Sequence, residues 1–483
     1  MALSLRPRAS LPAGEFHSTA AEALRRVPQA TALRLGVLPY RLDGAELYVE
    51  VEHDASTVLD ALRAETGLRI HATRAASSLD ARIRAAYAPA NEPMSEAFDD
   101  AAPAVRALDE IHGEALERGA SDVHIEPAHA GGRVRLRVDG LLRKSRRLDG
   151  DLFAQVVSRI KVLAALDIAE RRQPQDGRYR IEHAGRSVEA RVSSMPTVGG
   201  EKLVVRLLDL HARVPHLDAL GIPDEILARL RAATQAAHGF VVVCGPTGSG
   251  KTTTLYAALA ERNTESQHLC SVEDPVEAYV SGMTQVQVNV RAGLTFESAL
   301  RSFLRHDPDA IVVGEMRDAQ TASAALSGTF VATTLHAPDA GRAIDRLSEL
   351  GVARATVAAA LSGVLAQRLV RKLCRECRRE TALAPQEARL LGLEPGSRAY
   401  TATGCAACGG AGYAGRTGIF EYLAFDDDMR RLVGAGASSV VLAGAARERG
   451  YRPMVDAARA AIVRGTTDLS EVLRVCAVGM AHA

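Results

Sequence analysis

The order of apolar and polar residues changes its period along this chain, and these changes divide the chain into segments. Near the N-terminus, alternation with a period of two predicts three strands, at residues 33–39, 45–52 and 68–73. Apolar residues at helical spacing predict two helices, at 56–66 and 78–87. Residues 88–103 are rich in Pro, Ala and acidic side chains without any period, which indicates a linker. The first segment is therefore predicted to be a small α/β module followed by a tether.

A longer segment with the same mixture of periods follows the linker. Helical spacing recurs at residues 104–118 and 152–166. Alternation typical of strands is found at 123–126, 133–138, 141–147, 178–182, 187–192 and 203–208. These elements predict an α+β domain that ends near residue 215. Beyond it, short apolar runs predict further strands, at 240–243, 311–313 and 330–335.

The apolar run at 240–243 leads into a glycine-rich loop and then into helical spacing. Residues 239–254 read GFVVVCGPTGSGKTTT, which is the strand, G-x-x-x-x-G-K-T loop and helix order of a phosphate-binding loop. Its glycines let phosphates approach backbone N–H groups, and the helix N-terminus adds partial positive charge. Lys251 can reach the β- and γ-phosphates, and the Thr252 hydroxyl can bind Mg²⁺. The loop therefore predicts a nucleoside triphosphate site, formed by Gly245, Pro246, Thr247, Gly248, Ser249, Gly250, Lys251, Thr252 and Thr253.

Two acidic motifs after the loop are candidates for the chemistry. The strand at 311–313 leads through Gly314 to Glu315, a position from which a carboxylate can orient or deprotonate the attacking water. Ordinary P-loop enzymes place a Mg²⁺-binding Asp where this chain has Gly314. Glu273, in the motif SVEDPVE, is a candidate to help hold Mg²⁺ instead, and the alternative is a plain acidic turn around Pro275.

The composition of the chain limits the classes of molecule that we expect it to bind. A chain of 483 residues predicts about three domains, and the net charge of +1 gives no general attraction to nucleic acid. There is no Trp, and aromatic residues make up 4% of the chain, so platforms for base stacking are scarce. No apolar run approaches 18 residues, and the opening MALSLRPRASLPAGEF lacks the apolar core of a secretory signal. We therefore expect a cytoplasmic protein that does not act on nucleic acid.

Four of the seven cysteines form two C-x-x-C pairs with 27 residues between them, Cys374/Cys377 and Cys405/Cys408. Four thiolates complete the tetrahedral shell of a structural zinc ion, and cysteines in a reducing compartment favour this use. A redox role for one of the pairs is the alternative. The other three, Cys244, Cys270 and Cys476, stand in apolar surroundings and are expected in the core.

Several ordered motifs give the chain a family resemblance across residues 105–475. Upstream of the loop stand SDVHIEP, LDIAERRQPQDGR and RVSSMPTVGGEKLVVRLL, and downstream SVEDPVE, LRHDPDAIVVGEMRD and TTLHAPDA. Together these resemble the secretion ATPase superfamily of type II secretion and type IV pilus ATPases. The cysteine pairs and GYAGRTGIFE (412–421) look like the type II secretion (GspE) and pilus-assembly branches, because retraction motors lack that region.

The resemblance implies a multidomain α/β fold in which a RecA-like P-loop domain follows an α+β domain. The implied order is an N-terminal docking module at 1–88, a linker at 89–103, the α+β domain at 104–215, the ATPase domain at 216–370, a zinc subdomain at 371–415 and a C-terminal helical region at 416–483.

It also implies roles for individual residues. Arg191 and Arg206 are expected to reach the γ-phosphate, where a guanidinium neutralises developing charge; ordinary surface arginines are the alternative. His336 matches one of two family histidines near the γ-phosphate and could instead be structural. Thr329 stands where the family has the other histidine, and the helix at 322–329 is about one turn shorter than usual.

The implied activity is Mg²⁺-dependent ATP hydrolysis by a homo-hexamer at the cytoplasmic face of an inner membrane. Residues 1–88 are expected to bind the cytoplasmic domain of a bitopic inner-membrane secretion protein. The basic segment 368–380 is a candidate for contact with anionic phospholipid, although a solvated helix face is the simpler interpretation. The resulting prediction is a motor for pseudopilus assembly in type II secretion. The alternatives are a pilus-assembly ATPase and a weakly catalytic, nucleotide-gated scaffold.

Overall fold

The computed structural model describes most of the chain, in the ranges 23–24, 26–51, 56–75, 79, 82–83, 86, 103–211, 213–319, 321–322 and 329–480. Residue contacts separate it into two compact units, 1–102 and 103–483. Within the described ranges, none of the helices combines the length and the apolar character needed to span a bilayer.

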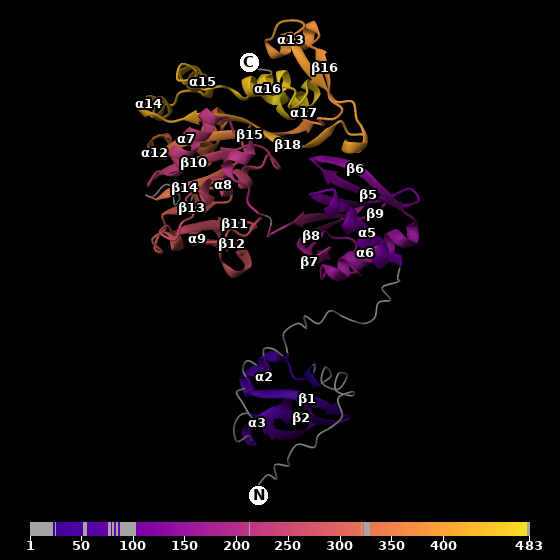
Figure 1. Ribbon diagram of the computed structural model, residues 1–483. Coiled ribbons are helices and arrows are strands. Elements are labelled where there is room, and N and C mark those ends of the chain that lie inside the picture. The colour runs from indigo at the N-terminus through magenta and orange to yellow at the C-terminus, as the bar shows by residue number, and fades with distance from the viewer. Residues whose placement is uncertain are drawn as a thin grey trace. The chain divides into compact units, whose positions relative to one another are not determined.

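The N-terminal unit is built around a three-stranded sheet in the order β1-β2-β3, with β1 and β2 antiparallel and β2 and β3 parallel (Figure 1). Alternate side chains of β2 point into its core because successive strand residues face opposite ways. Its elements are α2 (Gln29–Leu35), β1 (Val37–Asp43), β2 (Glu46–Val51), α3 (Ser56–Thr66) and β3 (Arg69–Arg74).

One expected strand of this unit is partly wrong. Residues 33–35, expected as strand, form the end of helix α2, and the strand begins only at Val37. Gly36 adopts a left-handed conformation with φ of 62° and closes the helix, a geometry that glycine adopts without strain. The expected linker, apart from residue 103, lies outside the described residues, as does most of the expected helix at 78–87.

Residues 103–208 form a six-stranded antiparallel sheet in the order β6-β5-β4-β9-β8-β7. Two helices cover one of its faces through a shared apolar core (Figure 1). The second helix ends three residues earlier than the expected 152–166, where Ala165 turns to a positive φ of 55°. The elements are α5 (Pro103–Glu117), β4 (Asp122–Ala128), β5 (Gly131–Val138), β6 (Leu141–Leu148), α6 (Gly150–Leu163), β7 (Gln175–His183), β8 (Arg186–Thr197) and β9 (Gly200–Leu208).

The next domain is a seven-stranded sheet in the order β12-β11-β13-β14-β10-β15-β18, parallel except for β18. Alternate residues of its central strands enter two apolar cores, one on each face, so helices cover both sides. The predicted α/β class is therefore confirmed. The strands are β10 (Gly239–Cys244), β11 (Leu269–Glu273), β12 (Met283–Gln287), β13 (Ala310–Val313), β14 (Phe330–Leu335), β15 (Leu361–Leu373) and β18 (Tyr413–Ala424). The helices around them are η1 (Leu217–Leu220), α7 (Asp224–Thr234), α8 (Lys251–Ala260), η2 (Val290–Ala292), α9 (Phe296–Phe303), α11 (Ala340–Glu349) and α12 (Arg354–Ala360).

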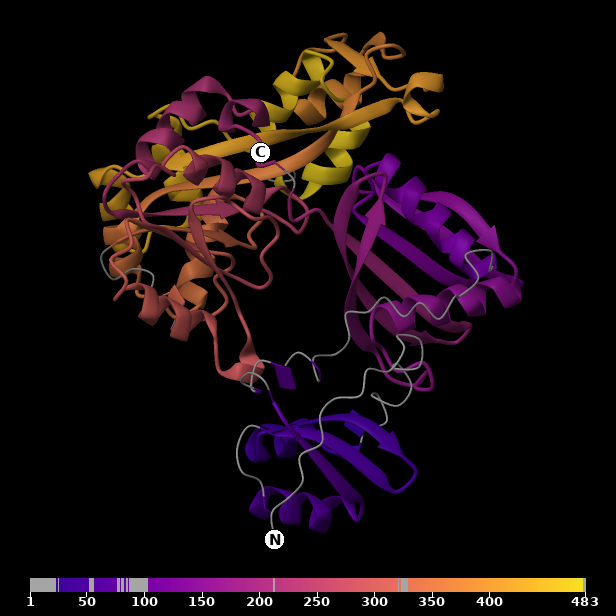
Figure 2. The ribbon, with the colours of Figure 1, turned by 60° about the horizontal axis from the view of Figure 1, so that its bottom comes forward.

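Strands β15 and β18 form a long antiparallel pair that continues past the rest of the sheet (Figure 2). The cysteine region lies between them in sequence and contains β16 (Arg379–Ala382), α13 (Pro385–Leu391), β17 (Arg398–Thr401) and η3 (Ala406–Cys408). Residues 416–424, expected in a helical region, belong to β18 instead, because they complete the ladder with β15. The helices that follow are α14 (Asp427–Gly434), α15 (Ser439–Arg447), α16 (Met454–Val463) and α17 (Leu469–Met480).

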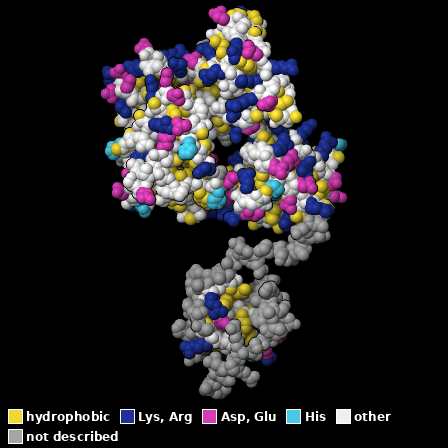
Figure 3. Space-filling view, viewed as in Figure 1, with side chains coloured by type: hydrophobic (Ala, Val, Ile, Leu, Met, Phe, Trp, Pro, Cys, Tyr) yellow, Lys and Arg dark blue, Asp and Glu magenta, His cyan; other side chains and the backbone are white. Residues whose placement is uncertain are grey.

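Charged side chains of both signs are intermixed over the face of residues 103–480 that Figure 3 shows. This agrees with the near-zero net charge of the whole chain.

Candidate active site

The phosphate-binding loop lies between the end of β10 and the start of α8. Gly250 is the N-cap residue of α8, with a left-handed φ of 84°. At Gly245 a Cβ atom would lie 2.6 Å from the backbone oxygen of Gln367, so only glycine fits against β15. The backbone N–H groups at the start of α8 are therefore placed to receive an anion.

Lys251, the first residue of α8, is 9% exposed. Its Nζ donates to the backbone oxygen of Pro246 at 3.0 Å, so the side chain folds over the loop. Burial lowers the pKa of the Lys251 ammonium, and the carboxylates of Glu315 and Glu277 oppose that change. The lysine predicted to bind phosphate is therefore largely shielded from water and lies near two carboxylates, those of Glu315 and Glu277.

A neighbouring strand supports the loop through a residue that the sequence gave no reason to select. Gln367 of β15 is 2% exposed, and its Nε2 donates to the backbone oxygen of Ser249 at 2.6 Å. Its Oε1 and the Ser249 Oγ are buried with no partner in the described structure. The contact joins residues 118 positions apart, so local pattern could not reveal it.

Glu315 lies just past the end of β13, at the same sheet edge as the loop. Its Oε2 accepts from Arg317 Nε at 2.9 Å, and its Oε1 lies 3.6 Å from His336 Nε2. Burial and the nearby Lys251 ammonium lower the pKa of His336, which is half exposed. The structure therefore brings Lys251, Glu315 and His336 together around one sheet edge. Arg317 joins them, and its place in GEMRD was the signal that could have identified it.

Glu273, at the end of β11, is 2% exposed and has both carboxylate oxygens occupied. Its Oε2 accepts from the Tyr256 hydroxyl, and its Oε1 accepts from Ser271 Oγ at 2.5 Å and Gln285 Nε2 at 3.2 Å. Burial raises its pKa, while these donors lower it. This carboxylate is used by the protein itself, which leaves the exposed Asp274 and Glu277 as the accessible acids of the motif.

Glu273 also packs closely against Gly314, the residue before Glu315. A Cβ atom at Gly314 would lie 3.2 Å from the Glu273 Cα and 3.4 Å from its Cγ. A side chain at position 314 would therefore require Glu273 to shift by a few tenths of an ångström.

Arg191 and Arg206 face each other across β8 and β9 in direct register. Arg206 Nε donates to Asp122 at 3.1 Å, and its side chain is 61% exposed. Arg191 Nε lies 3.4 Å from Glu189. Among the described residues, neither arginine has an ion pair or hydrogen bond with the phosphate-binding loop. The pair is thus placed together on one face of the six-stranded sheet, apart from Lys251 and Glu315.

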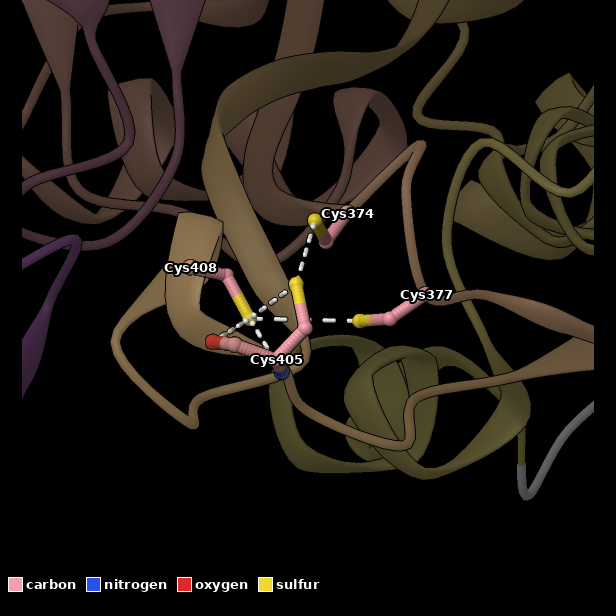
Figure 4. A group of neighbouring side chains, drawn as sticks. All are labelled: Cys374, Cys377, Cys405 and Cys408. Atoms are coloured by element: carbon pink, nitrogen blue, oxygen red, sulfur yellow. Dashed lines mark hydrogen bonds between the residues drawn. The ribbon is translucent and has the colours of Figure 1, made fainter.

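The four paired cysteines converge in the loop between β15 and β18, and their sulfur atoms point toward one another (Figure 4). All four Sγ atoms lie within 4.8 Å of one another. The Cys374–Cys405 and Cys377–Cys408 distances are both 3.9 Å, and the Cys405–Cys408 distance is 3.8 Å. A tetrahedral ion with metal–sulfur bonds of about 2.3 Å requires sulfur separations of about 3.8 Å. The residues therefore fit a four-thiolate metal site.

Backbone N–H groups of Cys405 and Gly412 donate to the Cys408 sulfur at 3.2 and 3.1 Å. Hydrogen bonds from the Cys405 N–H first, then from the Gly412 N–H and the neighbouring cysteines, lower the pKa of the Cys408 thiol to about 6. Such second contacts favour the thiolate form that a metal ion binds.

Half of the basic side chains between residues 368 and 380 contact other parts of the protein. Arg368 is buried and donates to the backbone oxygen of Pro338, Arg371 pairs with the buried Glu471 at 2.7 Å, and the exposed Arg378 donates to the backbone oxygen of Gly465. The other three, Lys372, Arg375 and Arg379, are also exposed. The region of the shortened helix, 323–328, lies outside the described residues; Thr329 Oγ1 donates to the backbone oxygen of Pro308 at 2.9 Å.

Comparison with known proteins shows the family to which this chain belongs. Residues 97–474 match the family described as type II/IV secretion system protein. The chain belongs to that family. It is 46% identical to the type II secretion system protein HxcR of Pseudomonas aeruginosa over 380 residues, 78% of each chain. It is 38% identical to the type IV pilus assembly ATPase PilB of Thermus thermophilus over 92% of this chain and 54% of PilB.

The fold itself also has solved counterparts. The ATPase DotB of Legionella pneumophila superposes with a TM-score of 0.57 at 21% identity, over 78% of this chain and 96% of DotB. DotB supports the fold alone; the family match and the identity to HxcR confirm the predicted membership of the secretion ATPases.

Proposed function

We propose that this chain hydrolyses ATP to power pseudopilus assembly and protein export by a type II secretion system. The observation that carries the proposal is the meeting of Lys251 and Glu315 at one edge of a parallel sheet, directly after a complete phosphate-binding loop. Family membership supports the same function, and the greater identity to HxcR than to PilB favours secretion over pilus assembly.

Each residue of the site has a separate role in ATP hydrolysis. The backbone of the loop from Gly245 to Thr252 binds the phosphates of ATP, and Lys251 neutralises charge on the β- and γ-phosphates. Glu315 orients the attacking water and accepts its proton. Arg317 donates to one oxygen of that carboxylate at 2.9 Å, which restricts the orientation of Glu315, and His336 lies 3.6 Å from the other oxygen.

Mg²⁺ fits the accessible oxygen ligands of this site. Thr252 stands beside Lys251 at the helix start, and Asp274 and Glu277 expose carboxylates after β11. Bound Mg²⁺ supplies neutralisation of phosphate charge. Because the Glu273 oxygens already accept three hydrogen bonds, we assign that residue no direct contact with the ion.

The remaining expectations belong to the same proposal. Cys374, Cys377, Cys405 and Cys408 hold one structural zinc ion, supported by the match of their spacing to tetrahedral geometry. Six copies form a ring in which Arg191 and Arg206 reach a γ-phosphate. The exposure of Arg206 supports this, as does the lack, among the described residues, of an ion pair or hydrogen bond from either arginine to the loop of its own chain. The protein works at the cytoplasmic face of the inner membrane. Contact with anionic lipid uses Lys372, Arg375 and Arg379.

The test of the activity is phosphate release by purified protein with Mg²⁺ and ATP. We expect hydrolysis by the wild type and loss of both nucleotide binding and hydrolysis in Lys251→Ala. The matched control, Lys144→Ala, removes an exposed lysine of β6 and should retain both. A wild type that is inactive with membranes and partner present would favour the scaffold alternative.

The test of the system uses the full chain and a variant that lacks residues 1–88. We expect the deletion variant to keep basal hydrolysis and to lose the ability to retrieve a bitopic inner-membrane secretion protein. The deleted residues are the proposed binding module, whose tether raises the local concentration of that partner. Retrieval of pilus components alone would instead favour pilus assembly.

A further inference from the structure

The hydroxyl group of Tyr256 donates a hydrogen bond to the carboxylate of Glu273 inside the ATPase domain. Tyr256 lies on α8, one helical turn after Thr252, and both partners are 2% exposed. Neither side chain is therefore placed to touch a nucleotide or an attacking water directly. Their contact joins the helix that begins at the phosphate-binding loop to the end of β11.

Glu273 also contacts residues outside α8. Its second oxygen accepts from Ser271 and Gln285, and Gln285 in turn donates to the Ala278 backbone oxygen at 3.0 Å. The Glu273 backbone lies against Gly314, the residue immediately before Glu315, where a Cβ atom would be only 3.2 Å from the Glu273 Cα. One buried carboxylate thus lies between the loop helix on one side and the segment that carries Glu315 on the other.

We propose that Tyr256 is a positioning residue of the ATPase site: through Glu273 it fixes the spacing between Lys251 on α8 and Glu315 beyond β13. The inference rests on the proposed ATP hydrolysis and extends it to a residue that contacts no substrate. Displacement of reacting groups by about 1 Å can cost about 100-fold in rate, so a rigid link between these two groups affects turnover. A link of this kind acts on the chemical step more than on nucleotide affinity, because each binding element remains intact.

The experiment is steady-state ATP hydrolysis by full-length Tyr256→Phe, which keeps the ring and removes only the hydroxyl. We expect kcat to fall about 10-fold and the KM for ATP to stay within about 2-fold. Glu273→Gln should lower kcat similarly. In a Glu273→Gln background, Tyr256→Phe should add little.

The matched control is Tyr451→Phe, which removes another tyrosine–glutamate hydrogen bond of the same protein, to the buried Glu421. It should lower thermal stability while kcat and the KM for ATP stay as in wild type. Equal kcat values in the two tyrosine variants, or a loss at Tyr256 that lies wholly in ATP affinity, would overturn the inference. An inactive wild type would overturn the proposed function and this inference together, whereas an active wild type with an unaffected Tyr256→Phe would overturn this inference alone.

Discussion

The nucleotide site and the cysteine cluster both depend on strand β15, but the two are assembled differently. The residues of the phosphate-binding loop are consecutive, and β15 adds only the support of Gln367. Cys374 directly follows β15, whereas Cys405 lies 31 residues later, just before β18. The first site is therefore built mainly by local backbone conformation, and the second by the long-range pairing of two strands.

This difference has a thermodynamic consequence. A loop fixed by glycine geometry and a helix N-terminus forms wherever the parallel sheet forms. A four-thiolate site closes a loop whose ends must first be brought together, so metal binding contributes directly to the folding of that loop. We expect the two sites to fail independently, and the predictions below test that independence.

The largest effect is expected for Glu315→Gln, which removes the proposed base and keeps the side-chain shape. Turnover should fall by about 10²- to 10⁴-fold, while ATP binding and bound metal per chain remain as in wild type. Phosphate release, nucleotide binding and elemental analysis measure the three. The control Glu297→Gln alters an acid of α9 that pairs with Arg301, and it should change none of them. Wild-type turnover in Glu315→Gln would remove this residue from the chemistry.

The sequence predicts the strand, loop and helix order around residues 239–254 correctly, because the signals for it are consecutive in the chain; the nucleotide contacts of these residues stay a prediction. It also predicts that the cysteines belong together, since paired C-x-x-C units have few other uses. It does not predict that Glu273 is buried or that Gln367 supports the loop. Both depend on packing between residues far apart in sequence, such as Gln367 and Ser249.

The same limit explains the errors in secondary structure. Residues 416–424 give no local sign that they pair with β15, so they were expected in a helical region. At the N-terminus, Gly36 ends a helix and Val37 begins a strand without a gap, and the apolar run across them resembles one strand.

The second-largest effect is expected when a cysteine of the four-thiolate site is replaced. Cys374→Ser should reduce zinc from one ion per chain to a small fraction and should loosen residues 374–413, because three thiolates do not complete the shell. ATP binding should change by less than about 3-fold if the sites are independent. Elemental analysis and hydrogen exchange of that region give the measurement. Cys476→Ser, a buried cysteine of α17 outside the cluster, should keep the zinc. A folded, fully active protein without zinc would make the cluster incidental.

A smaller effect is expected at Arg206, which lies on the six-stranded sheet. Arg206→Ala should lower kcat by about 10-fold or more in the assembled protein, because a guanidinium that neutralises transition-state charge is lost. Arg186→Ala is the control: it lies on β8 of the same sheet, is 55% exposed and pairs with Asp209 at 3.0 Å. Equal rates in the two variants would mean that Arg206 serves only its ion pair with Asp122.

The smallest effect is expected at Gln367, the β15 residue whose side chain donates to the phosphate-binding loop. Gln367→Leu removes the amide that donates to the Ser249 backbone oxygen at 2.6 Å and leaves that oxygen buried. A lost hydrogen bond of this kind is worth about 0.5–1.5 kcal/mol, so ATP affinity should weaken by about 2- to 10-fold. Zinc content should not change, because the strand continues to Cys374 with its backbone ladder intact.

Thr333→Val provides the matched control for this change. Thr333 is fully buried on β14 of the same sheet, and its hydroxyl donates to the Val313 backbone oxygen at 2.8 Å without contact to the loop. It should lower the free energy of unfolding by a similar amount and leave ATP affinity unchanged. Isothermal titration with a non-hydrolysable ATP analogue, beside thermal melts, separates the two outcomes. If Gln367→Leu also released zinc, the strand would couple the two sites, and their independence would be disproved.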